Sequence, residues 1–352
     1  MSCFPVPALA LALDLLLGDP PSLPHPVRGI GWLAGKLEAP ARQLAIFCGH
    51  PVLAGALALA ILCSISGGLA ALLCALPGFL GTAMALYLAF SGLALGGLTS
   101  AGQDCLTLIE KAQKNSADLP KARRAVQMLV SRDTAAMEAP ELYRSLAESL
   151  SENLNDAFVA PFFWLCLSGP VGLWLYKTVS TMDSMWGYKN ERFLHLGRAS
   201  ARLDDLLAFI PARLCVLLML ATAWARNLPG VFSAWRKAGL EEGRKKEGKA
   251  PLKKNIIRTA VFSVPGWPGW GSVARQAKGM DSPNAGWPMA AAAWLFNGRS
   301  GGPTPYDGEI KEKALLGPDS GLWTARNCAQ LLAHARATGI AGLILSALLL
   351  CY

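Results

Sequence analysis

Two long apolar stretches without a charged residue constrain the fold of this chain more than any other feature. Residues 52–76 and 79–98 are rich in Ala, Leu and Gly, and only Pro77 and Gly78 separate them. Because a helix needs about 20 apolar residues to cross the hydrocarbon layer of a bilayer, both stretches are predicted to be transmembrane helices. Only 16% of the 352 residues are charged, against about 25% in soluble domains. The sequence therefore predicts an all-α, polytopic integral membrane protein with broken or re-entrant helices.

The other apolar segments are shorter or interrupted. Val6–Leu17 is too short to cross a bilayer upright and carries Asp14, so we expect a short embedded helix, with Asp14 either in a polar site or near the interface. Residues 157–176 are interrupted by proline and glycine, and residues 206–224 contain a proline and Arg213. Since broken helices in membranes commonly line polar cavities, one or both segments are predicted to be re-entrant or interrupted, with Arg213 facing the site rather than lipid.

The chain is predicted to form a single membrane-embedded domain over residues 1–352. Its expected segments are an N-terminal embedded helix with two transmembrane helices (1–100), a cytoplasmic helical segment (101–156), broken apolar helices (157–224) flanking a polar motif (181–205), a basic cytoplasmic segment (225–337) and a C-terminal apolar helix (338–352).

The excess positive charge is confined to one of these segments. Residues 225–337 hold 17 Lys and Arg against 8 Asp and Glu, whereas the rest of the chain holds 16 of each, so the net charge of +9 lies there. Such a segment indicates cytoplasmic placement, and its charged loop at 244–254 is expected next to anionic lipid. No basic stripe interleaved with aromatic residues and no zinc-finger spacing favours nucleic acid. The nine cysteines are scattered without ligand spacing, which argues against a zinc or iron–sulfur site.

Two clusters of ionisable residues border the broken segments. Glu148, Glu152 and Asp156 recur every fourth residue and would share one face of a helix. Like charges at this spacing repel, so the pattern predicts a divalent cation or neighbouring arginines, the alternative being a solvated acidic face. Carboxylates of this kind suit Mg²⁺. The motif at 181–205 is the second cluster, and a re-entrant segment between them would let the two form one site.

Three loops are further candidates for ligand contact. Residues 18–31 are proline-rich, predict an extended loop, and contain His25 and Arg28. The turn at 281–288 precedes a helix expected at 289–296, where Ser282, Asn284 and free backbone amides suit a phosphate. A glycine-rich turn at 297–302 follows. The loops at 281–288 and 297–302 could each be no more than a turn, and the glycine-rich one matches neither a Walker A nor a Rossmann pattern.

Six stretches recur together in an order that resembles the adenosylcobinamide-phosphate synthase family, the integral-membrane enzymes of cobalamin (vitamin B12) biosynthesis. They are LDLLLGDPPSLPHPVRGIGWL near the N-terminus, LVSRDT at 129–134, AESLSENLNDAFVAPFFW at 147–164, TMDSMWGYKN at 181–190, GRASARLDDLLAFIPAR at 197–213 and DSPNAGWP at 281–288. The resemblance covers nearly the whole chain, and six ordered motifs are far more specific than any one of them.

The resemblance implies an activity. Members of the family join adenosylcobyric acid to (R)-1-amino-2-propanol phosphate, or to ethanolamine phosphate, through an amide, using ATP and Mg²⁺. An acyl phosphate would be the activated intermediate, with an acyl adenylate as the alternative. The expected location is the inner (cytoplasmic) membrane, multi-pass, with the active site facing the cytoplasm. The lipid bilayer is an expected partner and nucleic acid is not. Other cobalamin-assembly enzymes or a second copy of the chain are further candidates.

With the resemblance, the ionisable motifs become candidate site residues. The predicted catalytic residues are Glu148, Glu152, Asp183 and Arg132, and the predicted metal ligands are Glu152, Asp156, Asp204 and Asp205. The predicted substrate-binding residues are His25, Arg28, Asn153, Lys189, Asn190, Arg198, Arg202, Arg213, Ser282 and Asn284. Arginines would clamp phosphates or carboxylates, and Asp183 would take the proton from the attacking ammonium.

Two other function classes also fit buried charges next to apolar helices. A transporter of an anionic metabolite would have broken helices as well, but it commonly shows internal repeats, and none is found here. A non-catalytic membrane scaffold would use the basic segment as a docking face.

Overall fold

The computed structural model describes residues 6–20, 25–188, 190–242, 266–306 and 309–350. The charged loop expected at 244–254 and Lys189 lie outside these residues. In chain order the helices are α1 (Val6–Leu17), α2 (Pro26–Cys48), α3 (Pro51–Cys74), α4 (Gly78–Gly92), α5 (Leu95–Lys114), a 3-10 turn η1 (Ser116–Asp118), α6 (Leu119–Gln127), α7 (Ala139–Asn153), a π-helical turn η2 (Leu154–Val159), α8 (Ala160–Trp186), α9 (Arg198–Leu207), α10 (Phe209–Glu242), α12 (Trp270–Ala277), α13 (Gly286–Leu295) and α14 (Ala325–Leu350). Strands β1 (Ser300–Tyr306) and β2 (Glu309–Leu316) form one antiparallel hairpin.

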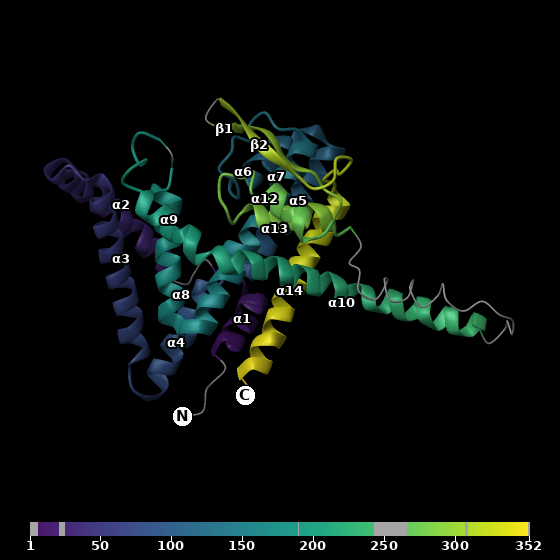
Figure 1. Ribbon diagram of the computed structural model, residues 1–352, viewed down its shortest axis with the longest axis horizontal. Helices are drawn as coiled ribbons and strands as arrows, with labels where there is room; N and C mark the ends of the chain where they lie inside the picture. Colours follow the sequence, from purple (N-terminus) through teal and green to yellow (C-terminus); the bar gives the residue numbers. More distant parts are fainter. Residues whose placement is uncertain (1–5, 21–24, 189, 243–265, 307–308, 351–352) are drawn as a thin grey trace.

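The elements separate into two regions (Figure 1). Helices α1, α3, α4 and α8 and the C-terminal half of α14 extend to one side, whereas α5, α6, α7, α12, α13 and the hairpin gather on the other. Among the residues that the structure describes, four helical runs are long and apolar enough to cross a membrane. On α3, large apolar side chains such as Leu57, Ile61, Ile65 and Leu69 are exposed. A row of this kind at helical spacing suits contact with lipid, so the chain is an all-α polytopic membrane protein.

Helix α8 reverses direction at Ser168–Gly169. Gly169 has φ 65° and ψ −164°, a conformation open mainly to glycine, and Pro170 follows it. An uninterrupted helix would place Asp156 and Ser184 about 40 Å apart at 1.5 Å per residue, yet both line one cavity. The segment therefore enters and leaves on the same side. This confirms the predicted interruption and brings residues 101–156 and 181–205 together.

The structure of the N-terminal segments agrees with the sequence-based predictions only in part. The short helix predicted at Val6–Leu17 is present with those bounds as α1. The extended loop predicted at 18–31 is wrong from Pro26 onward, because Pro26 is a favourable first residue for α2 and His25 caps that helix through Val27 N. Arg28 is consequently a helical residue.

The predicted transmembrane helix at 79–98 is divided at Leu93 and Ala94, whose backbones are not helical. Asp14 of α1 explains how the second half begins: its Oδ2 accepts hydrogen bonds from Leu95 N (3.0 Å) and Gly96 N (3.1 Å). These amides have no partner within their own helix, so a buried carboxylate satisfies them.

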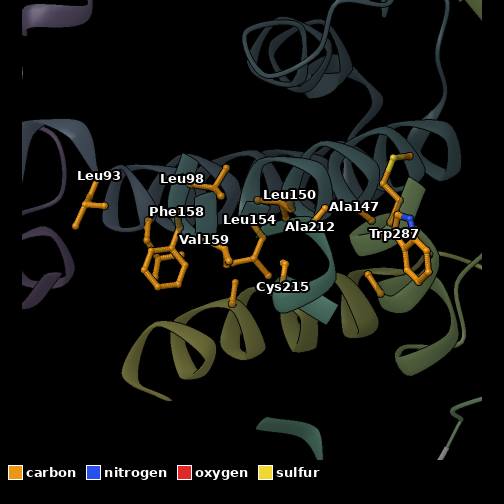
Figure 2. Close-up of a cluster of buried hydrophobic side chains, with 14 of the residues drawn as sticks. Leu93, Leu98, Ala147, Leu150, Leu154, Phe158, Val159, Ala212, Cys215 and Trp287 are labelled. Carbon is orange, nitrogen blue, oxygen red and sulfur yellow. The ribbon is translucent and has the colours of Figure 1, made fainter. Parts of the chain in front are cut away.

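The central core lies where α5, the α7–η2–α8 run, α10, α13 and α14 meet. Figure 2 shows its side chains, from Leu93 and Phe158 at one end to Trp287 at the other, with Leu150, Leu154 and Cys215 between them. All of these are buried. The π turn η2 lies in the middle of this core and begins two residues after Glu152, so the core fixes the backbone that carries the acidic residues.

Helix α3 approaches the Leu196 backbone closely at Gly55, so a larger residue there is expected to affect stability. A Cβ at Gly55 would lie 1.8 Å from the Leu196 carbonyl oxygen, whereas one at Gly68, on the same helix, would meet nothing within 4 Å. Gly55→Ala is therefore expected to lower stability by about 1–3 kcal/mol through overpacking. Gly68→Ala should be neutral or slightly stabilising, because alanine favours helix. Thermal unfolding of both variants in detergent would test this, and equal midpoints would contradict it.

Candidate functional site

A cavity of about 380 Å³ opens between α7, the end of α8, the loop before α7 and the hairpin. Only two of its lining residues are apolar; the lining consists of Leu129, Val130, Ser131, Arg132, Ser149, Glu152, Asn153, Asp156, Ser184 and Lys313. Four of these were predicted from the sequence: Arg132, Glu152, Asn153 and Asp156. Walls with carboxylates, cations and hydroxyls suit a polar, charged ligand.

One wall of the cavity is a buried ion pair. Arg132 Nη2 contacts Glu148 Oε2 at 2.5 Å, and both side chains are less than a tenth exposed. The other Glu148 oxygen accepts a hydrogen bond of 2.7 Å from Gly301 N. Glu148 was predicted to be catalytic, but its two oxygens are occupied by contacts within the protein. In the structure Glu148 contacts Arg132 and the start of β1.

Glu152 near the end of α7 and Asp156 within the π turn η2 both line the cavity. Single π turns occur often at functional sites because they redirect side chains. Asn155 Nδ2 donates to Asp156 Oδ1 at 2.7 Å. Glu152 interacts electrostatically with Lys313 and Arg132 as well as with Asp156. The balancing charge expected from the acidic spacing is thus supplied in part by basic side chains.

Lys177 is a second source of compensating charge. It interacts electrostatically with Asp156 and with Asp14 of α1. Because both acids come from segments far apart in the sequence, Lys177 connects the N-terminal helix to the acidic cavity.

The remaining predicted acids lie next to the cavity. Asp204 on α9 interacts electrostatically with Asp156, Asp183 and Asp205, so α8 and α9 contribute to one acidic cluster with the π turn. Asp204 Oδ1 is buried and makes no hydrogen bond. A carboxylate oxygen in this position suits a cation.

The same cluster does not form a complete metal site by itself. Within the residues that the structure describes, no three His, Cys, Asp or Glu side chains are grouped closely enough to hold a metal ion. Mg²⁺, however, usually takes one or two protein carboxylates and completes its coordination with phosphate and water oxygens. Asp204 and Asp156 fit that arrangement.

Arg213, Ser282 and Asn284 lie together at the junction of α9 and α10. Arg213 Nη1 donates to Asn284 Oδ1 at 2.6 Å, and its guanidinium lies over the Phe209 and Trp287 rings. Asn284 Nδ2 donates to the Asp205 carbonyl at 2.7 Å. Ser282 Oγ accepts from the backbone amides of Asn284 and Ala285. The prediction that Arg213 faces the site is not borne out, because Arg213 does not line the polar cavity and its contacts instead fix the 281–288 turn against α9.

Neither His25 nor Arg28 is among the cavity walls, and His25 interacts electrostatically with Lys177 and Arg28. Burial lowers the pKa of His25, and the positive charges of Lys177 and Arg28 lower it further, while Asp19 opposes them. A neutral His25 capping α2 is consistent with its hydrogen bond from Val27 N.

The other predicted residues lie on the loop between α8 and α9 and on α9 itself. Asn190 Oδ1 accepts from Phe193 N and so stabilises the local turn. Arg198 is exposed and, with His195, lines a second, mostly apolar hollow of about 390 Å³. Arg202 is also exposed. The structure does not bring Asn190, Arg198 or Arg202 among the residues that line the polar cavity.

This loop is fixed to α2 by a charge network. Arg192 donates to both oxygens of Glu38 at 2.8 and 2.9 Å, and Arg42 donates to Glu38 at 3.0 Å. Burial raises the pKa of Glu38, but the hydrogen bonds from the two arginines outweigh it and hold the pKa below its usual value.

The Glu38 network predicts a pH-dependent contribution to stability. A carboxyl whose pKa is lowered on folding stabilises the protein above its unfolded pKa, about 4.3, and this contribution is lost as the pH falls through the lowered value. Arg192→Gln is expected to cost about 0.2–1 kcal/mol at pH 7, because Arg192 is exposed. The difference from the wild type should shrink below pH 4. Apparent unfolding midpoints across this range, with Arg124→Gln at an exposed position of α6 as control, would test it. A constant difference between Arg192→Gln and the wild type would contradict it.

Sequence reasoning missed two basic residues of the site. Lys177 had a usable signal, because an ionisable residue at the edge of an apolar segment is a candidate functional group. Lys313 had no usable sequence signal, since it lies in an ordinary charged strand, 309–316. Only the fold of the hairpin brings it to the cavity.

These features define a class: a polytopic helical membrane protein with a re-entrant helix that carries a charged cavity. Comparison with known proteins identifies the family. The family described as CobD/Cbib protein matches residues 7–334. The chain is 36% identical over 312 residues to the cobalamin biosynthesis protein CobD of Pelobacter propionicus (88% of this chain, 84% of the relative) and 31% identical over 315 residues to that of Klebsiella pneumoniae (88% and 85%). No solved structure matches the chain.

The chain belongs to the CobD/CbiB family. This supports a role as a biosynthetic enzyme of cobalamin synthesis, the process named for these relatives.

Proposed function

We propose that this protein is an ATP-dependent ligase that joins adenosylcobyric acid to an amino-alcohol phosphate, (R)-1-amino-2-propanol phosphate or ethanolamine phosphate, giving adenosylcobinamide phosphate. The observation that carries the proposal is the cavity itself: Arg132 and Lys313 lie in the same walls as Glu152 and Asp156. Condensing two anionic substrates requires cations to bind them and a carboxylate to accept a proton. Membership of the CobD/CbiB family supports a reaction of cobalamin biosynthesis.

The chemistry needs two steps. A carboxylate oxygen of the corrinoid attacks the γ-phosphorus of ATP. The bond between this phosphorus and the bridging oxygen breaks, ADP departs, and an acyl phosphate forms on the corrinoid. The amine nitrogen then attacks the acyl carbon, phosphate leaves with the C–O bonding electrons, and the nitrogen loses a proton as the amide forms. Most of the acceleration in such transfers comes from positioning and charge stabilisation.

The residues of the cavity divide between these tasks. Arg132 and Lys313 would bind anionic oxygens. We assign proton acceptance to Glu152, because it lines the cavity, whereas Asp183, the base expected from the sequence, does not. Ser149 and Ser184 would orient substrate oxygens. Asp156 and Asp204 would hold Mg²⁺, which when bound would neutralise phosphate charge.

The proposed location follows from the same features. The polar cavity lies in the region where α5, α7 and the β hairpin gather. ATP is cytoplasmic and residues 225–337 are basic, so we place this side in the cytoplasm and the protein in the cytoplasmic membrane.

Product analysis of the detergent-solubilised protein would test the proposal. With ATP, Mg²⁺, adenosylcobyric acid and one amino-alcohol phosphate, we expect amide product and ADP in equal amounts, and neither when the acid or the amine is omitted. AMP in place of ADP would contradict the acyl phosphate. Absence of product with both amines would contradict the ligase and favour a transporter or a scaffold.

A further inference from the structure

The β hairpin carries a lysine into the cavity from a segment that otherwise lies apart from it. Lys313 is on β2, paired with Gly302 on β1. It is half-buried and lines the cavity with Arg132 and Glu152. Lys311, two residues nearer the hairpin tip, is exposed and does not line the cavity.

The base of the hairpin is held firmly against α7. Gly301 N donates to Glu148 Oε1 at 2.7 Å, and Arg144 donates to the carbonyls of Gly301 (3.1 Å) and Pro303 (3.3 Å). Gly301 itself has φ 81°, and a Cβ there would lie 1.9 Å from the Ala314 carbonyl oxygen. The register that places Lys313 is therefore fixed by contacts with the helix that also carries Glu152.

Lys313 and several hydroxyl groups supply hydrogen-bond donors at this end of the cavity, beside the carboxylates of Glu152 and Asp156. Arg132 is balanced by its buried pair with Glu148. Lys313 adds a further positive charge beside Glu152, and Ser131, Ser149 and Ser184 add hydroxyl groups to the walls. A flexible ammonium in the same cavity as hydroxyl groups suits a phosphate group.

We propose that Lys313 is a substrate-binding residue, positioned by the Glu148–Gly301 and Arg144 contacts, that binds a phosphate group in the cavity. The inference rests on the proposed function and extends it. Two substrates carry this chemistry, the terminal phosphate of ATP and the phosphate of the amino-alcohol, and the experiment below separates them.

The test compares Lys313→Ala, Lys313→Arg and the matched control Lys311→Ala in the full-length protein. KM would be measured separately for ATP, for the amino-alcohol phosphate and for adenosylcobyric acid. Lys313→Ala is expected to raise the KM for one phosphate substrate by about 10–100-fold, since hydrogen bonds to charged groups are the stronger ones. The substrate whose KM rises identifies the phosphate. Lys313→Arg should recover most of the affinity, and Lys311→Ala should match the wild type.

Two results would overturn the inference while leaving the ligase intact. One is an unchanged KM for both phosphate substrates in Lys313→Ala. The other is a fall in kcat alone, which would make Lys313 only a counter-ion for Glu152. Should the wild type form no amide, equilibrium dialysis with labelled ATP–Mg²⁺ and with the amino-alcohol phosphate still tests whether Lys313 binds a phosphate group. Binding that is lost in Lys313→Ala and kept in Lys313→Arg supports the inference. Equal binding in all variants overturns it.

Discussion

Glu152→Gln is expected to lower the rate of amide formation by about 10²–10⁴-fold, the usual contribution of a general acid or base. Glutamine has nearly the same shape as glutamate, so the cavity should keep its form while it loses the group that accepts the proton. Glu152 lies beside Asp156 and interacts with Lys313 and Arg132. Because only the proton-accepting step is impaired, kcat should fall with little change in KM.

The control for this prediction separates chemistry from folding. Asp104→Asn removes one acidic charge at an exposed position of α5 and should leave turnover unchanged. Gel filtration and unfolding midpoints should show Glu152→Gln as stable as the wild type, or more stable, since its carboxylate repels Asp156. Near-normal turnover in this variant would remove Glu152 from the reaction and return Asp183 as the candidate base.

Glu148→Ala is expected to be strongly destabilising, by about 3–5 kcal/mol. The change removes the counter-ion of Arg132, which is itself 5% exposed, and leaves Gly301 N without its acceptor. A buried arginine with no partner costs far more than an exposed one. Loss of folded protein in detergent, or a fall in the unfolding midpoint of many degrees, would show the effect.

A double-mutant cycle would show whether the ion pair is the cause. Arg132→Ala/Glu148→Ala should be less destabilised than the sum of the two single variants, because no unpaired charge remains. If the destabilisation of the double variant equals the sum for the two single variants, the ion pair is not the cause of the destabilisation. If Glu148 acted only in catalysis, Glu148→Ala would lose activity and keep its stability.

Local chemistry was sufficient to predict the class and several elements. Charge-free stretches predicted the membrane helices, Val6–Leu17 appeared with the expected bounds, and the proline and glycine near Gly169 predicted the interruption of α8. These features depend on neighbouring residues, so they can be read from the sequence. The break at Leu93 was missed because a distant side chain, Asp14, caps the start of α5. The start of α2 had a local signal, Pro26 after His25, but the proline-rich stretch was interpreted as a loop.

The sequence by itself determined a helical membrane protein of the CobD/CbiB family and the residue types of its site. Only the tertiary structure decided which of those residues share a cavity: Arg132, Glu152, Asn153 and Asp156 do, whereas Glu148 became a structural ion pair and Lys313 joined from a strand. The physical reason is that spacing along one helix fixes which face a side chain occupies. Its partners come from the chain reversal at Ser168–Gly169, which brings Ser184 to Asp156, and from the hairpin, which brings Lys313 from more than a hundred residues away.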